Sequence, residues 1–303
     1  MKKGILFVIL SGVCFWFVNF LVKIFGGNTI VFGHSIQKLP AHELVLARSI
    51  VSFVISSFFI FRKKLPYFGV NKKWLVIRGT AGTIALTLFF MTIQNLPFAI
   101  AAIIQYLAPL FTMLFTFILL GEKIFRVQWL FVLLAFSGVC LISLQNYISA
   151  DSGLVFQPLW VGLGMLSASI SGVAYTAIVK LKETDEPISI VLYFPMISIP
   201  IMLVLCMFDF VMPHGVEWLL LLLVGVFTQF AQVLLTKALH MGTSSVIIPF
   251  QYLGIIYAIL VGYLIFDERL NTFVNIGVLM ILSGILMNAY FRFKKTEKKF
   301  KNP

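Results

Sequence analysis

Two apolar stretches of this chain, residues 97–124 and 243–270, repeat one pattern at an offset of 146 positions without a gap. Each is longer than the roughly 20 residues that a helix needs to cross a bilayer. An internal repeat in a chain of this kind is typical of transporters built from two related halves. The residues that coincide are Gln105-Tyr106-Leu107 with Gln251-Tyr252-Leu253, Glu122-Lys123 with Glu268-Arg269, and Ser137-Gly138 with Ser283-Gly284.

The composition excludes a soluble fold. The 303 residues are 60% hydrophobic and 11% charged, whereas a soluble protein carries roughly 25% charged residues. The net charge of +12 does not indicate nucleic-acid binding, because the basic residues are spread over the ends of apolar segments, as topology determinants are. We expect no nucleic-acid partner, no cofactor and no metal, since the cysteines lie inside apolar segments and the histidines show no ligand spacing.

Ten segments are apolar and long enough to span a membrane, which predicts an all-α membrane protein of ten transmembrane helices. The first segment follows Met1-Lys2-Lys3 without a cleavage site and is expected to be retained. Residues 1–149 and 150–303 are the two predicted repeats of five helices each. The predicted helices cover 4–24, 43–61, 74–94, 97–119, 127–145, 157–179, 188–208, 217–236, 243–265 and 271–291.

The lysines and arginines predict that both termini are cytoplasmic. If the N-terminus lies inside and the segments alternate, only Lys23, Lys38, Arg48 and Arg269 of the 23 basic residues fall in the outer half. The reverse orientation would invert that ratio. Because five is an odd number, the second repeat is predicted to be inverted relative to the first. The expected location is the inner (cell) membrane, which the protein crosses many times.

Two glutamines are the main candidates for substrate contact. Gln105 and Gln251 each lie eight residues after the start of their predicted helix, which is roughly 12 Å at 1.5 Å per residue. The two starts are on opposite faces, so both side chains approach the midplane, where polar groups tend to face a wet cavity. Tyr106, Tyr252 and Tyr257 could add an aromatic wall. The alternative for all five is hydrogen bonding and packing between helices.

Prolines and acids mark where these two helices could move. Pro109 has no N–H to donate to the carbonyl of Gln105, and Pro249 has the same effect in the second copy. Both are predicted kinks, which serve either a moving helix or packing alone. Glu122 and Glu268 end the two helices and are predicted to form a salt bridge or a clasp between the repeats, which could act as a gate.

Further polar residues lie on the neighbouring helices. Gln229 and Gln232 are three residues apart and share a helix face, and Thr83 and Thr87 give the third helix a polar side. These residues are expected to line the transport path. For Arg48 two roles stay open: its charge either snorkels to the outer headgroups or faces an anionic substrate. Nearer the inner surface, Arg78 is expected to anchor its helix at the interface.

The stretch from Arg78 to Arg126, with FFMTIQNLPFAIAAIIQYLAPLF and LLGEK, resembles the EamA type of the drug/metabolite transporter superfamily. The resemblance extends over nearly the whole chain and implies ten helices in two inverted repeats of five, with a central cavity lined by the middle helices of each half. The second copy departs from the first, because Ile255 stands where Pro109 does. Other matching residues are Trp16, Asn19, Lys23, Arg48 and Ser137-Gly138.

These patterns predict a carrier that moves a small, polar, amino-acid-like metabolite by alternating access, as an exporter, exchanger or facilitator. A nucleotide-like or S-adenosylmethionine-like exchanger is the alternative, and a stacked aromatic pair in the cavity would favour it. An integral membrane enzyme would need clustered acids or histidines, and here they are scattered. No acid lies in the middle of a predicted span, which argues against a carboxylate proton relay. The expected partners are the solute and the bilayer.

Overall fold

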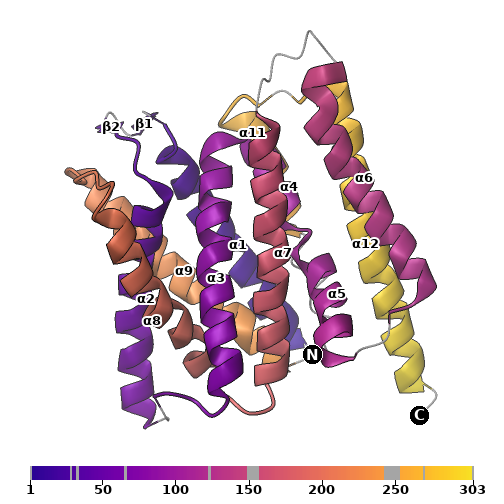
Figure 1. Ribbon diagram of the computed structural model, residues 1–303, viewed down its shortest axis with the longest axis horizontal. Coiled ribbons are helices and arrows are strands. Elements are labelled where there is room, and N and C mark those ends of the chain that lie inside the picture. The colour runs from indigo at the N-terminus through magenta and orange to yellow at the C-terminus, as the bar shows by residue number, and fades with distance from the viewer. Residues whose placement is uncertain are drawn as a thin grey trace.

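The structure, a computed structural model, describes residues 2–27, 29–31, 34–64, 67–121, 124–148, 157–241, 253–268 and 270–301. Within these ranges the chain is a bundle of helices with one short hairpin (Figure 1). The elements are α1 (Lys2–Ile24), β1 (Thr29–Val31), β2 (His34–Ile36), α2 (Ala41–Lys63), α3 (Lys72–Asn95), α4 (Phe98–Gln105), α5 (Ala108–Leu120), α6 (Arg126–Ile148), α7 (Pro158–Leu181), α8 (Pro187–Cys206), α9 (Val216–Met241), α11 (Leu253–Leu264) and α12 (Thr272–Lys301).

Nine segments among the described residues are long and apolar enough to cross a membrane. They coincide with nine of the ten predicted spans, and α4 and α5 together make one of them, Phe98–Leu120. The remaining predicted span, 243–265, is described only from Leu253. Large apolar side chains such as Phe58 and Phe61 point outward, 59% and 87% exposed, as expected of a surface that faces lipid. The prediction of an all-α membrane protein is confirmed.

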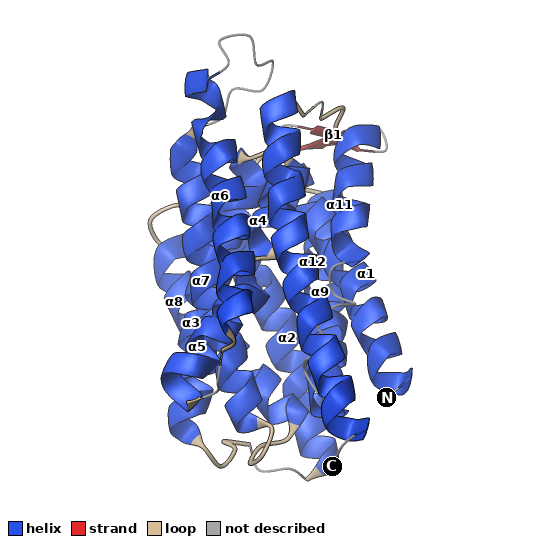
Figure 2. Cartoon of the chain, turned by 90° about the vertical axis from the view of Figure 1, so that its right-hand side faces the viewer, coloured by secondary structure: helices blue, strands red, loops and turns tan. Residues whose placement is uncertain are grey.

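The two ends of the bundle are distinguished by what they carry. Both chain termini lie at one end, here called the terminal end, and the β1–β2 hairpin lies at the other, the hairpin end (Figures 1 and 2). The hairpin pairs its strands antiparallel, with Ile30 opposite Ser35. Termini that share one end require an even number of crossings between them.

Helix pairing brings distant parts of the chain together. The most extensive contacts join α6 to α12, α3 to α7, and α1 to α9. In Figure 1, α6 and α12 run side by side along the right-hand edge. Their approach depends on glycine, because a Cβ on Gly138 would come within 2.5 Å of the Gly277 carbonyl oxygen, and one on Gly284 equally close to that of Phe131. Small residues of this kind let helix backbones touch in a membrane.

The span that contains Gln105 is broken in the middle. Helix α4 ends at Gln105, Tyr106 and Leu107 form a turn, and α5 begins at Ala108 with Pro109 in its first turn. Proline is accepted at the start of a helix because the N–H that it lacks would have no partner there. The break therefore falls where the sequence places a proline at membrane depth, and it leaves Gln105 at a helix end.

Candidate substrate site

A cavity of about 150 Å³ lies between the helices of the two predicted repeats. Side chains from α1, α2, α3, α4, α7, α8 and α9 reach it, together with Tyr106 and Pro109 at the α4–α5 break. Its described lining contains two arginines, two glutamines, two tyrosines and several phenylalanines, and no aspartate or glutamate. A polar cavity inside a helix bundle is where a membrane protein places groups that bind a solute.

Arg48 lies on α2 and turns into this cavity. It is the eighth residue of α2, roughly 10 Å from the hairpin end of that helix. Its side chain is 2% exposed, and its guanidinium carbon lies 4.7 Å from the ring centre of Phe194 and 6.0 Å from that of Phe90. Its Nε has no hydrogen-bond partner. The burial of Arg48 does not match snorkelling to the outer headgroups, and its role in facing an anionic substrate stays a prediction.

Arg78 reaches the same cavity from the other end of the bundle. It is the seventh residue of α3 and is only 4% exposed. Its guanidinium carbon lies 5.9 Å from the ring centre of Phe194, and its Nη2 donates to Gln232 Oε1 at 3.3 Å. The expectation that Arg78 anchors its helix at the interface is wrong, because the long side chain extends inward from its backbone position.

Gln105 lines the cavity and also joins α4 to α7. Its Nε2 donates to Ser171 Oγ at 2.9 Å, and its Oε1 accepts from Ser167 Oγ at 3.1 Å. Contact with the cavity and bonding between helices, which the sequence presents as alternatives, therefore coexist at this residue. Tyr106 and Pro109 line the cavity beside it.

The two glutamines of α9 have different surroundings. Gln232 borders the cavity and accepts from Arg78. Gln229 is 2% exposed and bonds to α2 instead: its Oε1 accepts from Ser52 Oγ and its Nε2 donates to Ser56 Oγ at 2.7 Å. We call Gln229, Ser52 and Ser56 the α2–α9 seam. These hydrogen bonds explain how Gln229 can lie buried in the bundle without contacting a solute.

Three other predicted candidates lie away from the described lining. Thr83 and Thr87 donate to backbone carbonyls one turn earlier in α3, those of Gly79 and Thr83. Tyr257 is 41% exposed and lies beside the Trp16 ring, 6.3 Å between centres. The predictions at Gln251, Tyr252, Pro249 and Glu122 fall outside the described residues.

Several aromatic residues belong to the cavity without being predicted as site residues. Tyr175 on α7 and Phe194 on α8 both line it. Phe194 lies beside both guanidinium groups, and such a contact between a cation and a ring face is favourable. Each sits in an apolar run where aromatic side chains carry no distinguishing pattern. The one available signal was that α8 also holds Pro195 and Pro200, which mark it as an irregular helix.

The hairpin end is closed by contacts between the two predicted repeats. The Glu268 carboxylate accepts from the backbone N–H groups of Phe98 and Ala99, the latter at 3.1 Å. These are the first N–H groups of α4, which have no partner within the helix and which attract negative charge. Nearby, Lys23 Nζ donates to the Leu96 carbonyl at 2.6 Å. Glu268 thus caps α4 from the other repeat, and its role as a gate stays a prediction.

A second contact closes the same end further along. The Glu217 carboxylate accepts from Gln37, through its backbone N–H and its Nε2, both at 2.8 Å. Glu217 is only 3% exposed. Since Gln37 follows β2 and Glu217 lies in the first turn of α9, this contact holds the start of α9 against the hairpin.

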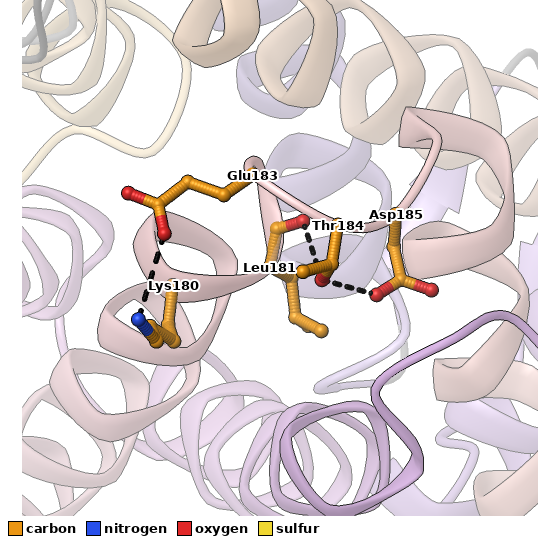
Figure 3. A network of polar contacts seen from close by, with 5 residues as sticks. All are labelled: Lys180, Leu181, Glu183, Thr184 and Asp185. Atoms are coloured by element: carbon orange, nitrogen blue, oxygen red, sulfur yellow. Dashed lines mark hydrogen bonds and ion pairs between the residues drawn. The ribbon is translucent and has the colours of Figure 1, made fainter.

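At the terminal end, a carboxylate in the turn between α7 and α8 joins the two predicted repeats. Asp185 accepts from the backbone N–H groups of Val70, at 2.5 Å, and Asn71, at 3.2 Å. Figure 3 shows this turn: Thr184 Oγ1 donates to Asp185 at 2.7 Å, and Lys180 pairs with Glu183 at 3.5 Å. The turn therefore anchors the start of α3 to the second repeat.

Comparison with known proteins identifies the family. The sequence profile of the EamA-like transporter family matches residues 2–144 and, a second time, residues 158–290. The chain belongs to this family. The pseudopaline exporter CntI of Pseudomonas aeruginosa (strain UCBPP-PA14) is 28% identical over 95% of this chain and 96% of its own length. The riboflavin transporter of Vibrio cholerae is 25% identical over 98% and 96%.

More distant relatives agree. Mouse solute carrier family 35 member G1 is 22% identical, covering 88% of this chain and 72% of its own. A solved crystal structure superposes with a TM-score of 0.65 at 16% identity, covering 97% of this chain and 99% of its own, which supports the fold alone. Family and relatives together make this chain a multi-pass membrane transporter of the drug/metabolite type.

Proposed function

We propose that this EamA-like transporter moves a small, polar, amino-acid-like solute across the inner membrane by alternating access, in the direction of export or exchange. The observation that carries the proposal is the cavity of about 150 Å³ between the repeats, lined by amides, tyrosine hydroxyls and two buried arginines. Pockets for drug-sized ligands measure roughly 300–1,000 Å³, so the described part of the cavity favours a small solute. A relative that is named an exporter supports outward movement.

The alternating-access mechanism rests on an inverted arrangement of the two repeats. The fifth helix of one repeat, α6, packs on the fifth of the other, α12. The first helix of the first repeat, α1, packs on the third helix of the second repeat, α9. In the same way the third helix of the first repeat, α3, packs on the first helix of the second, α7. Both patterns are expected when a pseudo-two-fold axis in the membrane plane relates the halves. The site then lies on that axis, between two halves that can rock.

The proposed orientation places the terminal end in the cytoplasm and the hairpin end outside. The arrangement follows the positive-inside rule and the shared end of the two termini. The contacts of Glu268 with the start of α4 and of Glu217 with Gln37 then hold the outer side closed. Asp185 at Val70 and Asn71 joins the repeats on the inner side. Each contact joins the two repeats, so opening either side requires breaking carboxylate bonds at that end.

The alternatives receive less support. A nucleotide-like or S-adenosylmethionine-like solute would be recognised by a parallel aromatic slot, and the adjacent rings of Phe89 and Phe90 in the cavity are tilted by 45°. A membrane enzyme would need clustered acid, histidine or cysteine side chains. Among the described residues no group of three such side chains could hold a metal.

Counterflow in proteoliposomes tests the proposal. Vesicles containing the full chain are preloaded with unlabelled solute and screened for entry of labelled amino acids and nucleotides, with and without a pH gradient. Accumulation of an amino-acid-like solute that ignores the gradient is the expected result. Gln105→Ala and Gln251→Ala should abolish or redirect this exchange and leave folding intact. Normal kinetics in both variants, or exchange of nucleotides alone, would contradict the proposal.

A further inference from the structure

We propose that the cavity recognises a solute with two carboxylate groups, one held by Arg48 and the other by Arg78. This inference rests on the proposed function and names the substrate class of the same site. Neither the family nor the names of the relatives assigns a role to either arginine.

The charge of the cavity requires anions. Both guanidinium groups are buried, and the Nε atoms of both lack hydrogen-bond partners. Within the part of the chain that the structure describes, neither arginine forms a salt bridge, and the cavity lining has no carboxylate. A guanidinium cannot shed its proton, and a buried charge without a counter-charge is costly. A single carboxylate would neutralise only one of the two charges, so two are needed.

The two cations reach the cavity from different helices. Arg48 enters from α2 near the hairpin end and Arg78 from α3 near the terminal end, and both approach the ring of Phe194 on α8. Each guanidinium lies beside Phe194 and keeps an Nε–H that no described group accepts. Planar guanidinium groups bind carboxylates through two parallel hydrogen bonds. A short chain that carries two carboxylates can bring one to each guanidinium within this small cavity.

Gly82 keeps the second arginine in place. A Cβ at Gly82 would collide with Nη1 of Arg78 and come within 3.0 Å of Phe194 Cδ2. The glycine therefore provides the space that the guanidinium occupies beside the ring. Other polar groups in the lining are neutral, such as Gln105, Gln232 and Tyr175. They can hydrogen-bond the rest of a solute but cannot balance a positive charge on it, so the preferred solute is a net anion.

Ligand-dependent thermal stability of the purified full chain tests this recognition directly. Succinate and glutarate are compared with propionate and butyrate, at equal ionic strength set with sodium chloride, and affinities are taken from the concentration dependence of the unfolding temperature. We expect the better dicarboxylate to bind at least about tenfold more tightly than the monocarboxylate of equal chain length, since charge-assisted pairs are the strong ones.

Single variants assign the two contacts. Arg48→Gln and Arg78→Gln should each reduce dicarboxylate affinity to the monocarboxylate level, and Arg48→Lys and Arg78→Lys, which keep the charge, should retain part of the preference. Arg62→Gln, at an exposed position near the other end of α2, is the matched control and should change nothing. Equal affinities for mono- and dicarboxylates, or a preference that survives Arg78→Gln, would overturn the inference.

Counterflow separates this outcome from failure of the proposed function. Labelled glutamate and glutamine differ by one carboxylate and have nearly the same size, and glutamate should exchange faster by about tenfold or more. Equal exchange of both would leave a small-solute carrier and remove the dicarboxylate site. Tight dicarboxylate binding without exchange of any small solute would retain the site and remove the proposed transport.

Discussion

Helix α9 carries two glutamines three residues apart whose roles differ. Gln229 gives both ends of its amide to the serines of the α2–α9 seam. Gln232 faces the cavity and shares its oxygen with Arg78, whose Nε remains unpaired. The comparison teaches that polarity at membrane depth does not by itself identify a binding site. The Gln229 amide, which is satisfied away from the cavity, stabilises the bundle, whereas an unpaired group on the cavity lining, such as Arg48 Nε, is available to a solute.

The largest expected effect comes from removing the least satisfied group. Arg48→Leu should reduce counterflow by at least about a hundredfold if two strong contacts to the solute depend on Arg48. The same change should raise the unfolding temperature of the ligand-free protein, because replacing uncompensated buried charge with apolar volume can stabilise by about 1–4 kcal/mol. Thermal unfolding and counterflow on one preparation check both. A lower unfolding temperature would show that Arg48 is structural.

Displacing Arg78 should reduce counterflow less than removing Arg48 does. Gly82→Ala is expected to push Arg78 away from Phe194 and reduce counterflow by about tenfold, as for the loss of one well-placed contact. Gly162→Ala is the matched control on α7, because nothing lies within 4 Å of a Cβ at that position. Equal rates in the two variants would contradict a positioning role for Gly82.

A substitution in the α2–α9 seam should lower stability and leave transport unchanged. Gln229→Leu removes two hydrogen bonds between α2 and α9 and is expected to lower the free energy of unfolding by about 1–2 kcal/mol. Counterflow per folded molecule should be unchanged. Gln232→Leu, which removes the group that accepts from Arg78 beside the cavity, should alter counterflow per folded molecule. Chemical denaturation in detergent measures stability, and counterflow measures transport. An equal change of counterflow in both variants would contradict the different roles of the two glutamines.

The smallest effect is expected at the hairpin end. Glu268→Gln keeps an oxygen that can accept from the first turn of α4 but loses the charge that favours a helix N-terminus, worth roughly 0.3–1 kcal/mol. Exchange rates should change by about two- to fivefold, less than with Gln105→Ala. Glu268→Ala, which removes the acceptor, should change them further. If both variants match the parent, opening of this end does not limit the rate.

Part of this arrangement could be predicted from sequence. Span length and composition predict nine of the spans seen, and the repeat together with Pro109 locates the broken helix beside Gln105. Periodicity could not separate Gln229 from Gln232, because positions three apart differ by about 60° around a helix. That difference decides between a seam and a cavity.

The prediction that Arg78 lies at the interface is wrong for a related reason. Counting residues from the helix start gives the position of a Cα, whereas a long side chain carries its charge several ångströms further. Tyr175 and Phe194 were missed because aromatic residues are common in apolar runs, and their role depends on which helices meet there. Such pairings join parts of the chain remote in sequence, such as α3 with α7, and no local pattern reports them.

The contact between α6 and α12 has a mechanical consequence. Where Gly138 meets Gly277 and Gly284 meets Phe131, the backbones of the two helices lie in close contact. We therefore expect α6 and α12 to resist sliding along each other. If the two halves rock as proposed, we expect the α6–α12 contact to change least and the helices that surround Arg48 and Arg78 to move most.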